Sequence, residues 1–564
     1  MSRKGITMNQ DEALSKLFGV SPHEQEPTGV RGILQTTDYL HFMILSDTGN
    51  ELLTFTGAKL ANKCLPGDHV RWDKQCELEL RDQHPLIVGT IELTGSSTYG
   101  LTKRGIPMYL FTPYDKSYPH FIVGCSEKDK RFNKIGLIQL EDWTATFPRG
   151  SLQQTLGVSG DHQAEEAALQ WQACPWKYPK YEYDPKINDD IKRTELQGVT
   201  FHIDPEGCKD VDDVLTFEKI TAVCWRVTIT ISDVAAFIED GGAIDIMASL
   251  IGQTLYNKDG KVLRPMLPSA YSEMVCSLLP GKQSYGISLQ FIWDGMAIYD
   301  IQWLETTLRV NHSYSYEEFQ ASDSPYKAPL AAIASFMAQR DVTDSHEWIE
   351  YMMIFYNTEA GKKLKKAGMG ILRRHSAPDR ERLEKYDAHF PELRFLAFSA
   401  AEYVLAEEQD TVHYGLASDT YAHASSPIRR YADLVNQRVL KQLIRKSSGY
   451  IVPITMYDMN RRGKAIKRFQ RDMDFLDALK TGCTTFTGII MEKIRMEDRT
   501  KIRIYLPQWK RMISTTYQTV SDDVVLSRDE KTEINITLYR EIQVHCTFLM
   551  QSRNWKERVI IHIT

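Results

Sequence analysis

Short β-rich runs at both ends of the chain place the strongest limit on its fold. Between Gly29 and Asp73 the runs "GVRGILQTT", "LHFMILSDTG" and "ELLTFTG" are separated by turn signals, and residues 87–147 repeat this pattern. After residue 480 the chain returns to runs such as "TKIRIYLP" and "EIQVHCTFLM". Short strands of this kind predict small barrels, with the OB barrel as the obvious candidate. We therefore expect three barrel-sized β modules, two N-terminal and one C-terminal.

The region between these modules mixes helices with strands. With 564 residues the chain is too long for one hydrophobic core, so three to five domains are expected. "TAVCWRVTITISDVAAFI" indicates a strand and "WIEYMMIFYNTEAGKKLKKAG" a long helix, while "FPRGSLQQTLGVSGDHQAEEAALQW" is expected to turn helical. The expected division is an N-terminal tail (1–28), a first barrel (29–86), a second barrel (87–170), a proline-punctuated connector (171–199), a mixed α/β domain (200–479) and a C-terminal barrel (480–564).

Charge and cysteine content argue against several classes of protein. The formal net charge of -6 argues against a protein that coats nucleic acid with its whole surface, so such a site would be a local basic channel. The nine cysteines form no Cys-x-x-Cys pair, which argues against structural zinc and against a disulfide framework. The N-terminus lacks the apolar core of a signal peptide, and no apolar run is long enough to span a bilayer. We expect a soluble, intracellular, cytoplasmic protein without membrane contact.

The stretch "DPEGCKDVDD" carries four aspartates: Asp204, Asp210, Asp212 and Asp213. Carboxylates held close together raise one another's pKa, and bound divalent cations remove that penalty. Mg²⁺ prefers carboxylate oxygens together with water and phosphate, and two such ions can promote phosphodiester cleavage. A turn at Gly207 would bring the side chains together. The residues alone leave two alternatives open, a metal-binding loop and a solvated acidic loop.

Two basic segments follow later in the chain. Arg429 and Arg430 come after a Ser-Ser-Pro turn and before a predicted helix, where an arginine can bind a phosphate through two hydrogen bonds. Further on, one face of a predicted helix carries four basic residues. They are Arg461, Lys464, Arg468 and Arg471, at i, i+3, i+7 and i+10. This face is either a solvated surface or one wall of a polyanion-binding site.

Several distant motifs resemble those of one known family. "DPEGCKDVDD" resembles the aspartate signature of the ribonuclease II (RNB) family of exoribonucleases. Residues 229–281, with Pro-Met-Leu-Pro and Cys-Ser-Leu, resemble its next block, and "RRHSAPD", "HYGLAS" and "YAHASSPIRRYADL" resemble later motifs in the right order. The N-terminal modules are similar to the family's two cold-shock domains, and the C-terminal module sits where the family carries an RNA-binding OB barrel. The resemblance covers roughly residues 29–564 and implies an α/β RNB catalytic core flanked by OB-fold barrels.

The resemblance also implies an activity and a site. The implied activity is Mg²⁺-dependent hydrolysis of single-stranded RNA from its 3′ end, with release of 5′-nucleoside monophosphates. Two Mg²⁺ ions, for which Mn²⁺ can substitute, are expected on the four aspartates. Asp212 matches the position required for chemistry, and Arg429 matches the residue placed against the scissile phosphate. The further expected substrate-binding residues are Tyr256 on the terminal nucleotide, Tyr316 near the 3′ end, Arg430, Lys464 and Arg468.

The chain departs from the family's pattern at three positions. Thr230 stands where a histidine is common, and Gln253 and Ser284 stand where the family usually has arginine. Two other functions compete with the exoribonuclease: an inactive RNA-binding scaffold on the same fold, and a metal-dependent nuclease acting mainly on DNA. The four retained carboxylates favour an active enzyme, and the RNA-type motifs favour RNA. The expected partner is single-stranded RNA, bound by a monomer, with association with a larger RNA-processing complex left open.

Overall fold

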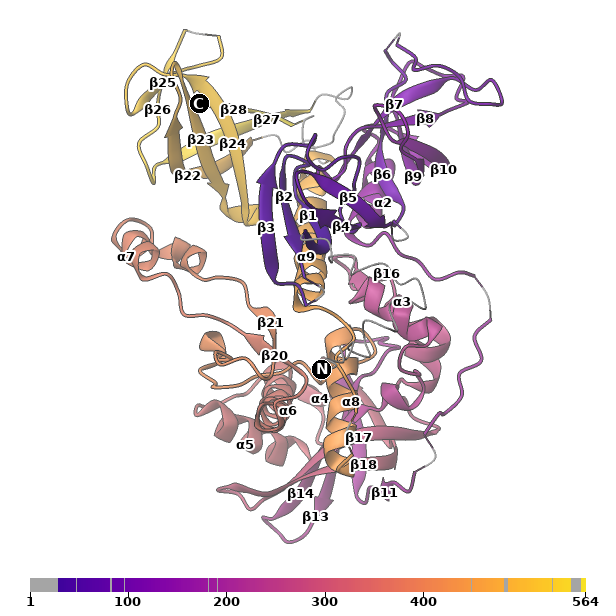
Figure 1. Cartoon of the computed structure of the whole chain (residues 1–564). Coiled ribbons are helices and arrows are strands. Elements are labelled where there is room, and N and C mark those ends of the chain that lie inside the picture. The colour runs from indigo at the N-terminus through magenta and orange to yellow at the C-terminus, as the bar shows by residue number, and fades with distance from the viewer. Residues whose placement is uncertain are drawn as a thin grey trace, which may run out of the picture. The chain divides into compact units, whose positions relative to one another are not determined.

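The computed structural model describes residues 29–564 except 47, 82–83, 96, 181, 190, 448, 481–484, 530 and 549–558 (Figure 1). The expected N-terminal tail, residues 1–28, lies outside this description. The chain divides into two compact units. One runs to His84 and includes Asp115–Pro119, and the other holds the remaining residues. Each unit has its own hydrophobic core.

The first unit is a five-stranded antiparallel sheet. Its strands are β1 (Val30–Thr36), β2 (His41–Leu45), β3 (Glu51–Thr56), β4 (His69–Trp72) and β5 (Cys76–Leu80). They lie in the order β3-β2-β1-β4-β5. Leu34, Ile44 and Val70 are fully buried, and the ring of Phe42 stacks on that of Phe55 with centroids 5.0 Å apart. The apolar side chains of these strands therefore meet on one face of the sheet.

The second β module is a closed barrel followed by a helix. Its elements are β6 (Ile87–Ile91), β7 (Met108–Pro113), β8 (Phe121–Gly124), β9 (Lys134–Asp142), β10 (Arg149–Val158) and α2 (His162–Ala173). The order β8-β7-β6-β9-β10 repeats that of the first sheet, and a parallel pairing of β10 with β8 closes the ring. A five-stranded barrel of this kind has the OB architecture.

The expectation that the chain turns helical directly after Phe147 is wrong for residues 149–158. This stretch is β10, because it pairs with β9 along its length and with β8 at its start. The helix begins only at His162, where the side chain of Asp161 accepts a hydrogen bond from the amide of Ala164 at 3.0 Å. Pairing with two neighbouring strands therefore outweighs the local sequence.

A seven-stranded mixed sheet forms the middle of the second unit. Its strands are β11 (Thr194–Glu195), β12 (Val199–Asp204), β13 (Asp213–Lys219), β14 (Trp225–Ser232), β17 (Gln283–Trp293), β18 (Ile298–Arg309) and β19 (His312–Ser315). They lie in the order β11-β18-β17-β14-β13-β12-β19, antiparallel except for the two edge strands. Two small ribbons accompany the sheet, β15 (Leu255–Tyr256) with β16 (Val262–Arg264), and β20 (Ile371–Arg374) with β21 (Glu402–Leu405).

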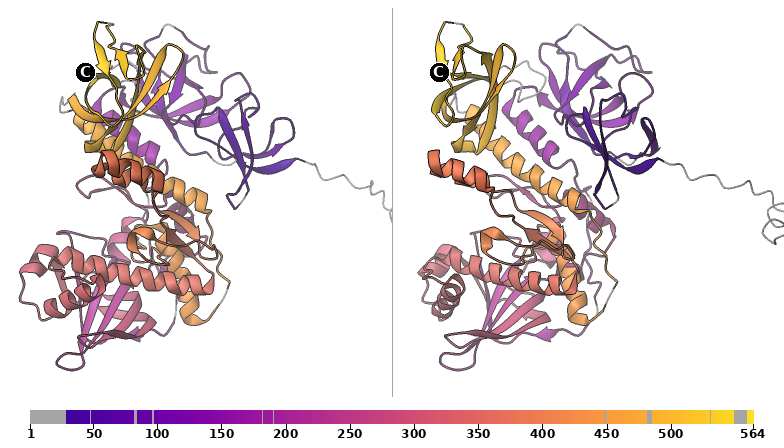
Figure 2. Two further views of the ribbon diagram at one scale, coloured as in Figure 1. Left: turned by 90° about the vertical axis from the view of Figure 1, so that its left-hand side faces the viewer. Right: turned by 60° about the vertical axis from the view of Figure 1, so that its left-hand side comes forward.

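Helices pack against this sheet and join it to the C-terminal part. They are α3 (Ala243–Ile251), α4 (Tyr316–Ala321), α5 (Lys327–Ala338), α6 (Ser345–Ala367), α7 (Arg380–His389), α8 (Tyr431–Arg445) and α9 (Met456–Lys480), with the short turns η1 (Val234–Ala236), η2 (Ala270–Val275), η3 (Pro391–Ala397) and η4 (Tyr414–Leu416). Figure 2 shows α5 and α6 lying against the central sheet. Their buried residues, such as Leu330 and Met352, share one core with Phe201 and Phe217 of the sheet.

The C-terminal module repeats the strand order of the first unit. Its elements are β22 (Thr485–Arg495), β23 (Arg499–Leu506), η5 (Pro507–Trp509), β24 (Arg511–Gln518), β25 (Val524–Leu526), β26 (Glu533–Asn535), β27 (Glu541–Phe548) and β28 (Val559–Ile563). The main sheet is ordered β24-β23-β22-β27-β28. Phe475 of α9 and Leu169 of α2 belong to the same core as Ile490 and Val544. Among the described helices, none is long and apolar enough to cross a bilayer.

Candidate functional site

The acidic stretch forms a loop between two neighbouring strands of the central sheet. β12 ends at Asp204 and β13 begins at Asp213, and the two strands are antiparallel. The turn between them is closed by a hydrogen bond from the Cys208 amide to the Pro205 carbonyl at 3.1 Å. Gly207 has a φ of 76°, a left-handed conformation that glycine adopts without strain. The predicted turn therefore exists, and it brings the first and last of the four aspartates to one end of the sheet.

Asp212 is the most constrained of the four. Its side chain is 4% exposed, and it is held by two neighbours from the segment before α8. Oδ1 accepts a hydrogen bond from the Ile428 amide at 3.0 Å, and Oδ2 accepts one from Arg429 Nε at 3.1 Å. Burial raises the pKa of Asp212 to about 7, although Arg429 and the Ile428 amide oppose the shift. A positive charge and an amide dipole thus stabilise a carboxylate that burial disfavours.

The other three aspartates surround the same region. Burial raises the pKa of Asp213 well above its usual range, and the charges of Asp204 and Asp212 raise it further. Asp210 Oδ2 accepts a hydrogen bond from the Tyr256 hydroxyl at 3.1 Å. Like charges that shift one another's pKa lie near one another, so Asp204, Asp212 and Asp213 are neighbours, and Asp210 lies in the same loop between β12 and β13.

This donor set fits a hard divalent cation. It offers carboxylate oxygens only, which are ligands that Mg²⁺ and Mn²⁺ prefer. It also concentrates negative charge in a partly buried place, and a bound cation would offset the cost of that charge. The aspartates are nevertheless an open set. In the part of the chain that the structure describes, none belongs to a group of three side chains whose ligand atoms all lie within 4.8 Å of one another. Mutual repulsion and the separate neighbours that hold Asp210 and Asp212 explain this spacing.

The two tyrosines predicted for substrate binding both border the aspartates. Burial raises the pKa of Tyr256, and so does the neighbouring Asp210. Burial raises the pKa of Tyr316, followed by the effect of Asp213. Tyr316 opens α4 and stacks on the ring of His346, with centroids 4.0 Å apart and planes at 11°. The stack fixes an aromatic face beside the acidic centre.

The two arginines of the Ser-Ser-Pro turn have different surroundings. The Arg429 side chain is 48% exposed and lies against Asp212, while its Nη2 donates to Ser426 Oγ at 3.1 Å. Arg430 points elsewhere and pairs with the buried Asp433 at 2.8 Å. Arg430 also lines a cavity of about 20 Å³ together with Gln253. Of these two arginines only Arg429 hydrogen-bonds an aspartate of the loop, although the charge of Arg430 also lowers the pKa of Asp212.

The basic face of α9 is partly neutralised. Arg461 pairs with Asp458 at 3.3 Å, and Arg468 pairs with Asp472 at 3.7 Å. Lys464 lies exposed on the helix surface.

The structure adds Lys467 and Arg373 to the basic residues that the sequence indicated on α9, and both lie near Arg471 of that predicted face. Burial lowers the pKa of Lys467, and the neighbouring cations Arg373 and Arg471 lower it further. Arg373 lies on β20, with its guanidinium 4.4 Å from the ring centroid of Tyr403. Asn460 of α9 holds Tyr403 in place by hydrogen bonds to both its backbone groups, at 2.7 and 2.9 Å. Lys467 and Arg471 are at i and i+4 on α9 and so share a side of the helix, whereas the packing of β20 and β21 against α9 brings Arg373 beside them, which the helical period alone could not reveal.

The three departures from the family's pattern lie at different places. Thr230 is fully buried in β14 and hydrogen-bonds Ser288 at 2.7 Å. Ser284 is buried at the start of β17. Gln253 forms an isolated β-bridge with Arg430. None of these three makes a hydrogen bond to the aspartates in the described structure, and Thr230 serves the packing of the sheet.

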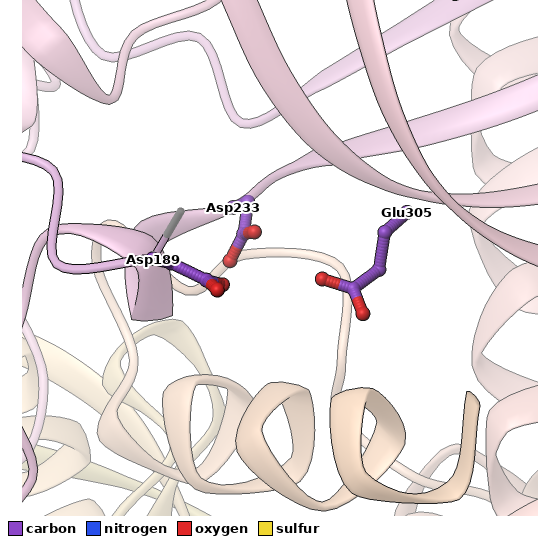
Figure 3. Close-up of side chains that lie close together, drawn as sticks. All are labelled: Asp189, Asp233 and Glu305. Carbon is purple, nitrogen blue, oxygen red and sulfur yellow. The ribbon is translucent and has the colours of Figure 1, made fainter. Parts of the chain in front are cut away.

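Another acidic cluster lies apart from the loop. Its members are Asp189 of the connector, Asp233 after β14, and Glu305 of β18, with carboxylates turned toward a common centre (Figure 3). Three cations fill that centre. Arg193 lies 2.6 Å from Asp233, Lys441 lies 2.7 Å from Asp189, and Arg445 lies 2.6 Å from Glu305. Three acids facing three bases form a neutral network, which binds the connector and α8 to the sheet and does not fit a metal ion.

Comparisons with known proteins cover both the central sheet and the second barrel. The model of the RNB domain matches residues 193–324 and 327–446, and that of the Dis3-like cold-shock domain 2 (CSD2) matches residues 108–173. The probable exosome complex exonuclease RRP44 of Caenorhabditis elegans is 23% identical over 463 residues, covering 64% of this chain and 48% of the relative. Ribonuclease R of Aquifex aeolicus is 25% identical over 361 residues, covering 50% of each chain. The chain thus spans about half the length of these curated relatives.

Two solved structures show the same fold at low identity. Mycoplasma genitalium RNase R, in complex with ribose methylated single-stranded RNA, superposes with a TM-score of 0.66 at 16% identity, covering 95% of this chain and 100% of that chain. Yeast Ssd1, described as a pseudonuclease, superposes with a TM-score of 0.60 at 16% identity, covering 96% of this chain and 83% of that chain. The predicted architecture, an α/β core flanked by OB-type β modules, is confirmed.

The charge network predicts a structural effect of Asp233→Asn. The substitution leaves Arg193 and Lys441 buried beside fewer negative charges, so the free energy of unfolding should fall by about 3–5 kcal/mol. Urea unfolding measures the loss. Asp129→Asn, which breaks an exposed pair with Arg131, is the control and should cost about 0–1 kcal/mol. A loss of bound Mn²⁺ without a loss of stability would contradict a purely structural network.

The raised pKa of Asp212 predicts how stability depends on pH in metal-free protein. The folded state keeps a proton on Asp212 up to about pH 7, whereas the unfolded chain releases it near 3.8. Stability should therefore fall as pH rises from about 4 to about 7. Asp212→Asn removes this contribution and should raise the free energy of unfolding at pH 8 by about 1–4 kcal/mol relative to wild type.

The measurement is urea unfolding in EDTA at pH 5 and pH 8. The exposed Asp498→Asn serves as the control and should follow wild type at both pH values. An Asp212→Asn protein whose stability changes with pH as much as that of wild type would show that Asp212 titrates normally.

Proposed function

The chain belongs to the RNB family, and on that premise we propose that it is a divalent-metal-dependent exoribonuclease. The proposed reaction is hydrolysis of single-stranded RNA in the 3′→5′ direction, with release of 5′-nucleoside monophosphates. One observation carries the proposal: the family's four aspartates gather at one end of the central sheet, with Arg429 placed on the buried Asp212.

The proposed metal ligands are Asp204, Asp210, Asp212 and Asp213, with two Mg²⁺ ions as the expected occupants and Mn²⁺ as a substitute. Such ions lower the pKa of an attacking water and stabilise the leaving oxygen. Asp212 is proposed to be essential because it is both buried and linked to Arg429. Its environment keeps the carboxylate in one position, which a divalent ion requires of its ligands.

Arg429 is the proposed contact of the scissile phosphate. Its guanidinium is half exposed, and only its Nε is used by Asp212. The remaining N–H groups include those that can bind phosphate oxygens and offset the charge that develops during cleavage. Arg430 is proposed to act indirectly, because its pairing with Asp433 holds the turn that presents Arg429.

Aromatic side chains are proposed to hold the unpaired bases at the 3′ end. Tyr256 and the stack of Tyr316 on His346 border the aspartates. Stacking accepts any base, so degradation should be largely independent of sequence. Contacts to 2′-hydroxyls would supply the preference for RNA over DNA.

A cationic path for the RNA backbone is proposed along α9. Lys467, Arg471 and Arg373 form a group of like charges between α9 and β20, where phosphates would relieve their repulsion. Lys464 and Arg468 remain the alternative pair, although Arg468 already has Asp472 as a partner. The two pairs lie side by side on one helix and share no residue, so their contributions are separable by substitution.

The second candidate function is an inactive RNA-binding scaffold. The likeness to yeast Ssd1, a pseudonuclease, favours it, because the same fold exists without activity. The retained aspartates favour the enzyme. We also propose a cytoplasmic monomer that binds single-stranded RNA, and association with a larger RNA-processing complex is supported by the RRP44 relative, which is named as an exosome component.

Cleavage of 5′-labelled single-stranded RNA tests the enzyme against the scaffold. Wild type with Mg²⁺ should yield a short labelled end product, because nucleotides leave from the 3′ end. Wild type with EDTA, and Asp212→Asn with Mg²⁺, should bind the RNA and leave it intact. DNA of the same sequence is the matched control and should persist. RNA that is bound and uncut in every sample would support the scaffold, and internal cuts would contradict an exonuclease.

The salt dependence of RNA binding tests the path along α9. In the Asp212→Asn background, Lys467→Ala with Arg471→Ala should lower the slope of log Kd against log salt by about 1.4, since each phosphate contact on a single strand contributes about 0.7. Lys464→Ala with Arg468→Ala is the matched pair, and a smaller change is expected because Asp472 already neutralises Arg468. A larger change for the second pair would indicate that the RNA backbone contacts Lys464 and Arg468 rather than Lys467 and Arg471.

A further inference from the structure

One histidine is built into the acidic centre and uses both of its ring nitrogens. His202 lies on β12, two residues before Asp204, and is 4% exposed. Its Nδ1 lies 2.9 Å from Asp204 Oδ2, and its Nε2 lies 2.6 Å from Ser313 Oγ. Both neighbours are thus within hydrogen-bond distance of a buried ring.

One assignment of the protons satisfies every group here, with Asp204 ionised and the His202 ring neutral. An ionised carboxylate only accepts hydrogen bonds, so Nδ1 carries the proton that Asp204 accepts. Nε2 is then the acceptor of the neutral ring, and the Ser313 hydroxyl donates to it. The result is a directed chain from Ser313 through His202 to Asp204.

Strand pairing holds this chain in place. β12 and β19 run parallel, with His202 opposite Ser313 and Asp204 opposite Ser315. Ser315 caps α4 by accepting from the Glu318 amide at 3.0 Å, which anchors the end of β19. The ring therefore cannot turn without breaking a hydrogen bond on each side.

The histidine orients only one of the two oxygens of Asp204. The Asp204 side chain is 18% exposed, and its Oδ1 accepts no hydrogen bond from any residue that the structure describes. Asp212 differs, because neighbouring groups bind both of its oxygens. A carboxylate with one oxygen held and the other free has the arrangement of a metal ligand supported by an outer partner.

We propose that His202, itself oriented by Ser313, is a positioning residue that holds Asp204 for binding a divalent cation. The inference rests on the proposed function, since it takes Asp204 as a metal ligand. Outer partners of metal ligands contribute roughly 10–100-fold to metal affinity. His202 accordingly sets the affinity of the centre without touching the RNA or the ion.

Mn²⁺ binding to RNA-free protein, measured by electron paramagnetic resonance, tests this role. The Mn²⁺ that is lost in Asp213→Asn defines the site. His202→Leu should weaken this binding by about 10-fold or more, because Asp204 loses its donor. Ser313→Ala should weaken it by about 3-fold, because the ring loses one of its two hydrogen bonds. His202→Asn should restore most of the affinity, since its amide nitrogen can stand where Nδ1 stood.

His41→Leu is the matched control. It removes a histidine whose Nδ1 lies 2.8 Å from Asp38 in the first β unit, and it should leave Mn²⁺ binding unchanged. Thermal unfolding in EDTA identifies any variant that fails to fold. If His202→Leu does not fold, Ser313→Ala and His202→Asn decide the question. Folded His202 and Ser313 variants that bind Mn²⁺ as tightly as wild type would overturn the proposal.

RNA cleavage in the same samples separates this inference from the proposed function. If wild type cleaves RNA and the His202 variants bind Mn²⁺ as tightly as wild type, the positioning role alone is overturned. Mn²⁺ binding that depends on His202 without any cleavage by wild type would support the positioning role and overturn the exonuclease. Wild type that binds no Mn²⁺ at the aspartates would overturn both.

Discussion

The gathering of four carboxylates in a partly buried loop is the constraint on which the central region depends. Burial and mutual repulsion both disfavour the charged forms, as the raised pKa of Asp212 and of Asp213 shows. Distant parts of the chain offset this cost. Arg429 and the Ile428 amide reach Asp212 from more than two hundred residues away, and Tyr256 reaches Asp210. The loop is therefore stable only inside the assembled fold, and a bound cation would complete its neutralisation.

The helix that presents Arg429 is held at both of its ends. At the N-terminal end, Asp433 binds the Ser426 amide at 2.8 Å and also pairs with Arg430. Further along, Lys441 and Arg445 enter the neutral charge network with the connector and the sheet. Buried ion networks often contribute little net stability, yet breaking one is costly, so they specify one arrangement. The network therefore holds α8 in place beside the acidic centre. Its three carboxylates are spaced as metal ligands would be, but cationic side chains occupy the space between them.

The fold alone does not determine whether the protein is active, because activity depends on particular side chains. The same architecture is found in a ribonuclease R and in a protein described as a pseudonuclease. A shared fold does not determine a shared reaction, since function resides in the site. In this chain the site residues are present and held by specific neighbours, which is the physical basis for proposing an enzyme. Thr230 stands where a histidine is common, and its hydroxyl hydrogen-bonds that of Ser288 inside the sheet rather than an aspartate of the loop.

Sequence by itself determined the features that depend on residue type and short spacing. These are the three β modules, the long helix α6, the acidic loop with its turn at Gly207, and the presence of an arginine after the Ser-Ser-Pro turn. Each follows from local conformational preference or from a short motif. Residues that are close in sequence are sufficient to specify both. The strand β10 marks the limit of this approach, because its pairing with two other strands overrides its local pattern.

Only the tertiary structure decided which side chains meet. It gave the adjacent Arg429 and Arg430 different partners and placed Lys467 near Arg373. It also surrounded the carboxylate of Asp233 with cations. It also placed Ser313 beside His202 and so turned an ordinary strand residue into a support for Asp204. The reason is that hydrogen bonds and ion pairs act over a few ångströms between residues that are far apart in the chain. Such contacts follow from strand register and helix packing, which no short stretch of sequence contains.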